Sequence, residues 1–102
     1  MKKEDIIQAV QAIVDRHLDE TYSLVLFGSQ ARGDASATSD IDIGILGPSP
    51  VPWHTYLAIR REVSVIPTLR RIDIVDLMGV REEFREQALR EGSTLLRTAQ
   101  TS

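Results

Sequence analysis

The sequence predicts a small α/β domain of the α+β type, in which a mixed β-sheet is flanked by helices. Apolar residues recur with helical period in some segments and with period two in others, in the order helix, strand, strand, helix, strand, helix. The chain has 102 residues, of which 42% are hydrophobic. That length supports one modest core and no second domain. We therefore expect one domain over residues 1–97 and a frayed tail over residues 98–102.

The first part of the chain contains one predicted helix and two predicted strands. Apolar side chains recur at helical spacing over residues 4–18, with polar side chains on the opposite face. Residues 22–28, YSLVLFG, form an almost continuous apolar run that ends in glycine, which is typical of a strand covered on both faces. The small polar residues of GDASATSD, 33–40, predict a loop. Residues 40–46, DIDIGIL, alternate with period two and predict a second strand.

The second part of the chain begins with a turn-rich connection, GPSPVP, at residues 47–52. Apolar stripes, β-branched residues and a glycine placed to end a helix then predict four more elements. These are a helix over 53–65, a strand over 70–77, a helix over 80–92 and a short strand over 93–96.

Composition and charge exclude several classes of protein. The net charge of −3 argues against a general electrostatic grip on nucleic acid, and the arginines of the second half are interleaved with acids, as on a solvated helical face. The chain has no cysteine, so it forms no disulfide or thiolate metal site. The first residues, MKKEDIIQAV, do not resemble a signal peptide, and no apolar run is long enough to span a bilayer. We expect a cytoplasmic protein.

Two aspartates lie within an otherwise apolar predicted strand. Period two directs the side chains of Asp40 and Asp42 to the same face, with their Cα atoms about 6.5 to 7 Å apart. If the predicted strand 70–77 pairs beside this one, Asp73 joins them, and three carboxylates can surround one or two Mg²⁺ ions for in-line phosphoryl or nucleotidyl transfer. The alternative is an edge strand with one solvated face, which also places aspartate at every second position.

A Gly-Ser pair follows the first predicted strand. Gly28 ends the apolar run, and Ser29 begins a turn whose next residues, QAR, suit a short helix. Such a turn directs backbone N–H groups and a hydroxyl outward, where they favour the outer phosphates of a nucleotide. The alternative is an ordinary tight turn. The Gly-Lys-Ser/Thr signature of a Walker loop is absent.

The combination of these motifs resembles the DNA polymerase β superfamily of nucleotidyltransferases. Gly28-Ser29, ten intervening residues, Asp40-x-Asp42 and a later hydrophobic-Asp-hydrophobic strand with Asp73 match its pattern. The longer string FGSQARGDASATSDIDIGIL resembles the minimal nucleotidyltransferases, called MNT proteins, over nearly the whole chain.

This resemblance implies a polymerase β-like nucleotidyltransferase fold and a set of residue roles. Gly28 and Ser29 would hold the β- and γ-phosphates of a nucleoside triphosphate, and Asp40 and Asp42 would bind Mg²⁺. Asp73 is implied as the third metal ligand and as a candidate general base. An acceptor hydroxyl would attack the α-phosphorus, and pyrophosphate would leave.

The minimal members also resemble the antitoxins of toxin–antitoxin modules whose partner is a helical HEPN-domain protein. The implied reaction is transfer of AMP from ATP to a tyrosine of that partner, within a homo- or hetero-oligomer. Two alternatives stay open: a non-catalytic module that neutralises its partner by binding, and an enzyme that uses a small-molecule or RNA acceptor with a separate acceptor-binding subunit. No direct binding of nucleic acid by this chain alone is expected.

Four further side chains receive structural roles. Arg32 could contact a phosphate, but we expect it to hold its loop through an ion pair, and we expect His17 to lie at the surface. Trp53 and Tyr56 follow the proline-rich connection near the expected mouth of the site; they could stack on a base, but we expect them to pack the helix.

Overall fold

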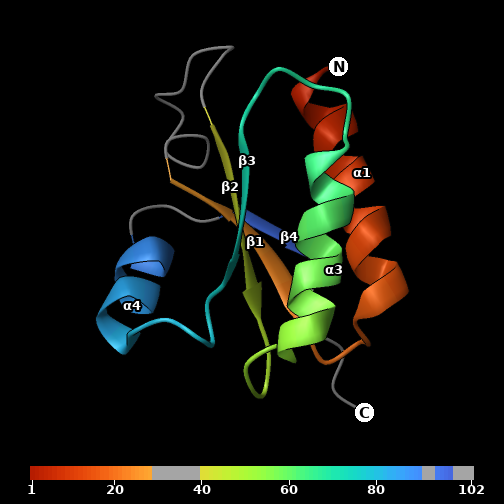
Figure 1. Cartoon of the computed structure of the whole chain (residues 1–102). Coiled ribbons are helices and arrows are strands. Elements are labelled where there is room, and N and C mark those ends of the chain that lie inside the picture. Colours follow the sequence, from red (N-terminus) through yellow and green to blue (C-terminus); the bar gives the residue numbers. More distant parts are fainter. Residues whose placement is uncertain (29–39, 91–93, 98–102) are drawn as a thin grey trace.

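The computed structural model describes residues 1–28, 40–90 and 94–97. Its elements are α1 (Lys3–His17), β1 (Ser23–Phe27), β2 (Ile41–Leu46), α3 (Trp53–Ser64), β3 (Ile72–Asp76), α4 (Glu82–Arg90) and β4 (Thr94–Arg97) (Figure 1). The strands form one sheet in the order β3-β2-β1-β4. β1 is antiparallel to β2 and to β4, whereas β2 and β3 are parallel. The predicted mixed sheet flanked by helices is confirmed. The tail predicted over 98–102 and the short helix at QAR fall outside the described residues.

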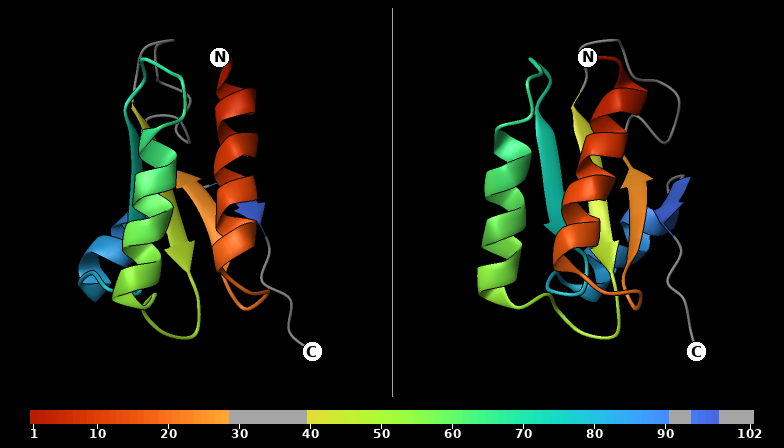
Figure 2. Two further views of the ribbon diagram at one scale, coloured as in Figure 1. Left: turned by 45° about the vertical axis from the view of Figure 1, so that its right-hand side comes forward. Right: turned by 90° about the vertical axis from the view of Figure 1, so that its right-hand side faces the viewer.

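The helices form two layers on the sheet. α1 and α3 lie side by side on one face, and α4 lies on the other face (Figures 1 and 2). The parallel pairing of β2 and β3 requires a crossover, which α3 provides. Within the described ranges, none of the helices has the length and apolarity that a membrane crossing needs.

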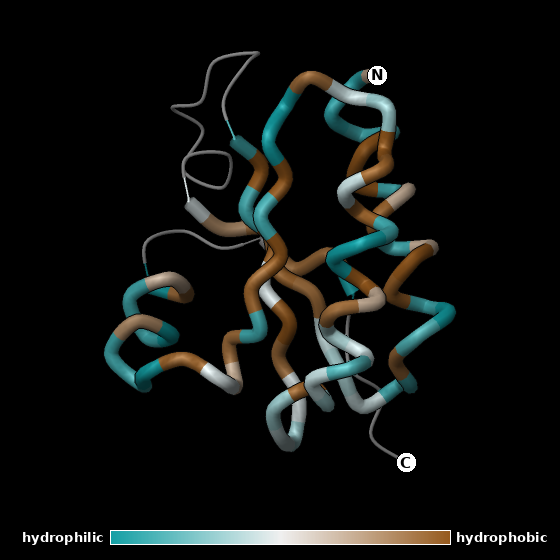
Figure 3. The backbone as a smooth tube through the Cα atoms, in the orientation of Figure 1, coloured by the Kyte–Doolittle hydropathy of each residue, from teal (hydrophilic) through white to brown (hydrophobic). Residues whose placement is uncertain are grey.

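The larger core lies between the sheet and the helices α1 and α3. Period two directs Ile41, Ile43 and Ile45 of β2 into this core, where all three are fully buried. Residues Ile6 and Val10 of α1 meet them from the helical layer. Burial of each such side chain contributes about 1.5 to 3 kcal/mol. Figure 3 shows the resulting alternation of hydrophobic and hydrophilic residues along the helices and strands.

A smaller core lies under α4, on the opposite face of the sheet. Val25, Phe27, Leu77 and Ala88 form it. Gly44 of β2 lies beneath Leu77, and a Cβ atom at position 44 would overlap the Leu77 side chain. The glycine in the alternating strand is therefore explained by the close approach of Leu77.

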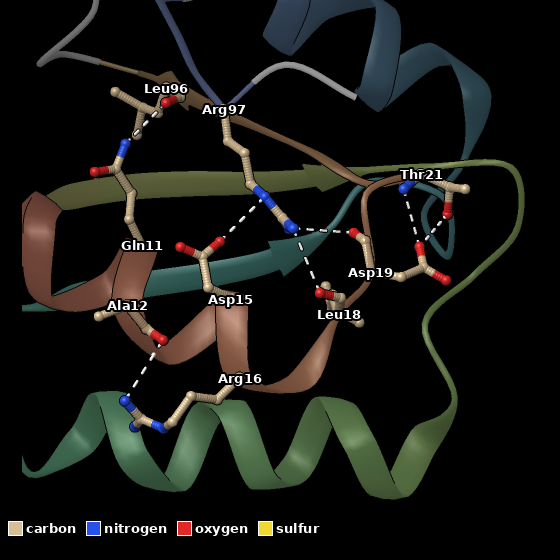
Figure 4. A network of polar contacts seen from close by, with 9 residues as sticks. All are labelled: Gln11, Ala12, Asp15, Arg16, Leu18, Asp19, Thr21, Leu96 and Arg97. Atoms are coloured by element: carbon tan, nitrogen blue, oxygen red, sulfur yellow. Dashed lines mark hydrogen bonds and ion pairs between the residues drawn. The ribbon is translucent and has the colours of Figure 1, made fainter. Parts of the chain in front are cut away.

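The last strand is fastened to α1 by polar contacts (Figure 4). The Gln11 side chain donates to the carbonyl oxygen of Leu96 at 2.8 Å. The Arg97 guanidinium forms an ion pair with Asp15 at 3.2 Å and donates to the carbonyl oxygen of Asp19 at 3.0 Å. These contacts hold the short strand β4, which pairs with β1, at the edge of the sheet.

A second polar cluster joins α1 to α3. The Glu62 carboxylate accepts a hydrogen bond from the Arg16 guanidinium and contacts the His17 ring. Hydrogen bonds from His17 and Arg16 lower the pKa of Glu62 below its ordinary value of 4.5. His17 is thus a partly exposed residue between two helices, away from the acidic strand.

Candidate active site

Strand register brings Gly28, Asp42 and Asp73 to one end of the sheet. Asp42 pairs with Phe27 across β1 and β2, and with Asp73 across the parallel strands β2 and β3. Gly28 directly follows Phe27 at the end of β1. The predicted pairing of strand 70–77 beside strand 40–46 is therefore confirmed, and it places the third aspartate beside the second.

The two paired aspartates face away from the larger core. Ile41 and Ile43 occupy the core face of β2, so Asp42, which lies between them, points to the α4 face. Asp73 shares that face because it pairs with Asp42 in register. Both carboxylates are half-buried. They are accessible to a ligand, yet sufficiently enclosed for the surroundings to change their ionisation.

The pKa of Asp42 is changed by its surroundings. Burial raises the pKa of its carboxyl group above the ordinary value of 3.8. The negative charges of Asp73 and Asp40 add to the rise, as does a hydrogen bond between the carboxyl groups of Asp42 and Asp73, whereas Arg71 opposes it. Two carboxylates in this arrangement are stabilised by a cation placed between them.

Gly28 adopts a backbone conformation that favours glycine. Its φ is +73°, and within the described residues it is the only one with a positive φ. A Cβ atom at this position would overlap Oδ2 of Asp42. The missing side chain therefore leaves space between the end of β1 and the carboxylate, and a phosphate could approach the backbone there.

Arg71 belongs to the same end of the sheet, although the sequence analysis did not select it. Its Nε donates to Oδ1 of Asp73 at 3.2 Å, and its side chain is 74% exposed. Arg71 precedes Asp73 by two residues, so period two places the two side chains on one face of β3. That spacing in RRIDIVDL is the signal that could have identified it.

The remaining predicted site residues are placed differently. Asp40 is exposed and lies just before β2, where its charge acts on Asp42. As they stand, no three carboxylate or imidazole side chains among the described residues are grouped closely enough to hold a metal ion. Ser29 and Arg32 lie outside the described residues.

The expectations for Trp53 and Tyr56 have different outcomes. Tyr56 packs against the larger core, as expected, and lies close enough to Asp73 for that charge to act on its hydroxyl. Trp53 is not near the mouth of the site, and the expectation for it is wrong. Trp53 and Tyr56 line a cavity of about 360 Å³ together with Val75 and Asp76, toward the opposite end of β3 from Asp73. Trp53 is 68% exposed, so it does not pack the helix against the sheet. The Tyr56 hydroxyl donates to the carbonyl oxygen of Ile74 at 2.6 Å. Trp53 lies far from the site because α3 begins beside the far end of β3.

An apolar cavity lies next to Gly28. It has a volume of about 170 Å³ and is lined by Phe27, Gly28, Phe84, Gln87 and Ala88. The rings of Phe27 and Phe84 meet edge to face, with centroids 6.5 Å apart. The carboxylates therefore have the Gly28 space and this cavity on the β1 side, and the edge strand β3 on the other.

The donor set suits a hard divalent cation. Carboxylate oxygens are the ligands that Mg²⁺ prefers, and Mg²⁺ commonly takes its remaining ligands from waters and substrate phosphates. Burial and, after it, the negative charges of Asp73 and Asp40 raise the pKa of Asp42, and a bound cation would offset both effects. The residues present therefore fit the implied metal, with Asp42 and Asp73 as its paired ligands and Asp40 as the neighbouring acid.

Comparison with known proteins assigns the family. Residues 8–101 match the family model described as "Polymerase beta, Nucleotidyltransferase", so the chain belongs to this family of enzymes. The match includes Gly28, Asp40, Asp42 and Asp73. The resemblance to minimal nucleotidyltransferases is confirmed by a solved structure described as a candidate minimal nucleotidyltransferase. It is 28% identical, has a TM-score of 0.59, and the match covers 94% of this chain and 97% of that one.

Two further proteins are similar to this chain. "Probable protein adenylyltransferase MntA" of Haemophilus influenzae is 27% identical over 86 residues, a match that covers 84% of this chain and 74% of the relative. A crystal structure of a toxin–antitoxin with AMP-PNP has a TM-score of 0.69 at 20% identity, and the match covers 92% of this chain and 74% of that one. At that identity, the second likeness shows the fold alone.

Proposed function

We propose that this chain is a Mg²⁺-dependent adenylyltransferase that transfers AMP from ATP to a tyrosine of a HEPN-domain toxin and thereby acts as its antitoxin. The observation that carries the proposal is the pairing of Asp42 with Asp73 beside the open space at Gly28. The name of the Haemophilus relative supports a protein as acceptor. The toxin–antitoxin whose fold is similar supports the partnership and an adenine nucleotide as donor.

Each residue of the site is assigned one role in the proposed reaction. The backbone at Gly28 lets the outer phosphates approach, and Ser29 is proposed to contact them as well. Asp40, Asp42 and Asp73 would hold Mg²⁺, which when bound neutralises phosphate charge and orients the reacting groups. The acceptor oxygen forms a bond to the α-phosphorus while the bond to the pyrophosphate oxygen breaks. The acceptor proton passes to a carboxylate oxygen of Asp73.

Transfer of label from α-³²P-ATP tests the proposal. Wild-type protein and Asp42→Asn are incubated with Mg²⁺, each with and without a HEPN-domain protein as the candidate partner. We expect wild type to label that protein on tyrosine and Asp42→Asn to leave it unlabelled. Asp76→Asn is the matched control, since Asp76 ends the neighbouring strand β3 and accepts hydrogen bonds from Val51 and Met78 away from the site.

The same experiment separates the alternatives. A stable complex without label from any nucleotide would contradict catalysis and favour a module that neutralises its partner by binding. Label on RNA or on a small molecule, with none on the partner, would retain the enzyme and overturn the protein acceptor.

A further inference from the structure

The open edge of β3 is the side from which an acceptor can reach Asp73. We propose that the acceptor is a protein segment with carboxylate groups beside the modified hydroxyl, and that Arg60, Arg70 and Arg71 receive it along this edge. This inference rests on the proposed function and adds the docking surface and the chemistry of the acceptor. We call the surface the β3-edge groove; it consists of Arg60, Ser64, Thr68, Arg70, Arg71, Ile72 and Asp73.

Strand order determines the direction of approach. The Gly28 space lies at the end of β1, Asp42 lies on the central strand β2, and Asp73 lies on β3. If the outer phosphates occupy the Gly28 side, the leaving pyrophosphate departs toward β1. In an in-line displacement the nucleophile attacks from the side opposite the leaving group. The acceptor hydroxyl must therefore arrive from the side of β3.

The edge of β3 is open to such an approach. Ile41 donates to the carbonyl oxygen of Arg71, and Leu77 donates to that of Ile45, so the odd-numbered residues of β3 pair with β2. The backbone groups of Ile72 and Ile74 consequently face away from the sheet. The Ile74 carbonyl oxygen already accepts a hydrogen bond from the Tyr56 hydroxyl, so an incoming segment would lie beside Ile72. Among the described strands, none pairs with this edge. An extended segment can lie there beside Asp73.

The groove beside this edge is polar and positively charged. Its first cavity, of about 130 Å³, is lined by Arg60, Ser64 and Asp73 together with Val63, Ile72 and Ile74. The second, of about 210 Å³, shares Ser64 and Ile72 and adds Thr68, Arg70 and Arg71. Three arginines therefore line the groove, of which Arg71 contacts Asp73 and Arg60 shares the first cavity with it, in a chain whose net charge is −3.

A buried nitrogen atom of Arg70 independently supports a ligand in the groove. Its Nη1 atom is buried, and within the described part of the chain it has no hydrogen-bond partner. A buried guanidinium nitrogen without a partner is costly, and a carboxylate from an incoming segment would satisfy it. The second cavity of the groove is lined by this residue.

A protein acceptor fits this groove better than RNA. Binding to a nucleic-acid backbone generally depends on an extended basic surface, because each bound phosphate requires a cation. Here the basic residues are confined to the groove, while the chain as a whole is acidic. A few carboxylates flanking one hydroxyl match three arginines in number and charge.

Two synthetic peptides and a matched set of variants test the inference. One pentapeptide has two glutamates on each side of a tyrosine, and the other has two lysines on each side of a tyrosine. We expect wild type to label the glutamate peptide with a kcat/KM about tenfold higher. Arg60→Gln and Arg70→Gln should each raise its KM about three- to tenfold. Arg61→Gln, on the same helix but outside the groove, should change nothing.

Binding measured without nucleotide or metal provides a second readout. Fluorescence anisotropy of a labelled glutamate peptide should show a Kd that rises in Arg70→Gln and with added salt, but not in Arg61→Gln. Equal labelling of both peptides together with unchanged binding in Arg70→Gln would overturn the inference. Preferential labelling of an oligoadenylate 3′ hydroxyl would overturn it in favour of RNA.

One further assay distinguishes an error in the proposed function from an error in the proposed docking surface. Hydrolysis of ATP to AMP and pyrophosphate, in which water replaces the acceptor hydroxyl, reports the nucleotide chemistry alone, and it should be lost in Asp42→Asn. If this activity is present while both peptides are labelled equally, only the docking surface is wrong. If wild type neither turns over ATP nor binds the glutamate peptide, both proposals are wrong.

Discussion

Asp42 and Asp73 lie directly opposite each other on parallel strands, and burial together with the charge of Asp73 raises the pKa of Asp42. Like charges that face each other across two strands destabilise a sheet. Folding alone gives no reason to place two half-buried carboxylates at one level of β2 and β3. The pair is therefore the feature on which the proposed cation site rests.

Replacing one member of this pair should stabilise the metal-free protein. Asp42→Asn removes the repulsion with Asp73 while preserving size and hydrogen bonding. We expect a gain of about 0.5 kcal/mol, or about 2 to 4 °C in Tm, at neutral pH with chelator present. Thermal melts followed by circular dichroism measure it. Asp15→Asn, which loses an ion pair with Arg97, should not raise Tm; a fall in Tm for Asp42→Asn would contradict the prediction.

Mg²⁺ should make the wild-type protein more stable than Asp42→Asn. At an Mg²⁺ concentration ten times its Kd, binding stabilises the folded wild type by about 1.4 kcal/mol. Asp42→Asn should show little of this shift because it lacks one of the paired ligands. The same melts are repeated over a range of MgCl₂, with NaCl at matched ionic strength as the control. An equal shift in both proteins would argue against a metal at Asp42.

Local sequence pattern was sufficient to predict the elements but only part of the site. Period two assigned Asp42 and the isoleucines beside it to opposite faces of β2, and the structure agrees. The place of Asp73 depended on which strand lies next to β2, a long-range pairing that was stated only as a condition. Once that pairing is known, Asp73 follows directly.

Most features that the sequence did not reveal are created by distant contacts. Arg71 is an exception, because its hydrogen bond to Asp73 spans only two residues and the spacing in RRIDIVDL contains the signal. Trp53 was assigned to the wrong end of the sheet because the direction of α3 relative to β3 is a tertiary property. Phe84 of α4 lies at the rim of a cavity, where its ring meets that of Phe27 while 46% of the residue stays exposed.

Alanine at position 28 should affect both stability and catalysis. The positive φ alone costs an alanine about 1 to 2 kcal/mol, or about 4 °C or more in Tm. Its Cβ would also displace the Asp42 carboxylate, for which we expect a loss of about 100-fold in kcat/KM. The matched control is Gly79→Ala, whose Cβ would lie 3.3 Å from Asp76 Oδ2, far from the site. Wild-type transfer by Gly28→Ala would contradict the role given to this glycine.

Gly44 should be required for stability. A Cβ atom there would lie 2.8 Å from Cγ of Leu77 and 3.3 Å from Cγ2 of Val25. Overpacking of this kind typically costs about 1 to 3 kcal/mol. Urea denaturation should show a lower midpoint for Gly44→Ala, with an unchanged slope. Leu77→Ala combined with Gly44→Ala should destabilise less than the sum of the two single changes, since each relieves the crowding of the other. Strict additivity would contradict the proposed contact.

The contact between α1 and α3 should make stability depend on pH in the acidic range. The pKa of Glu62 is lowered in the folded protein by His17 and Arg16. The unfolded chain therefore takes up a proton at Glu62 first, and the stabilisation is complete only above the ordinary pKa of 4.5. As the pH falls from there through the lowered value, the stabilisation is lost.

Glu62→Gln should accordingly have a lower Tm than wild type at pH 6, and the difference should disappear toward pH values below the folded pKa. Glu20→Gln, an exposed acid outside the cluster, should keep the wild-type Tm at both pH values. A difference between wild type and Glu62→Gln that grows on acidification would show that the carboxylate is not held by these two cations.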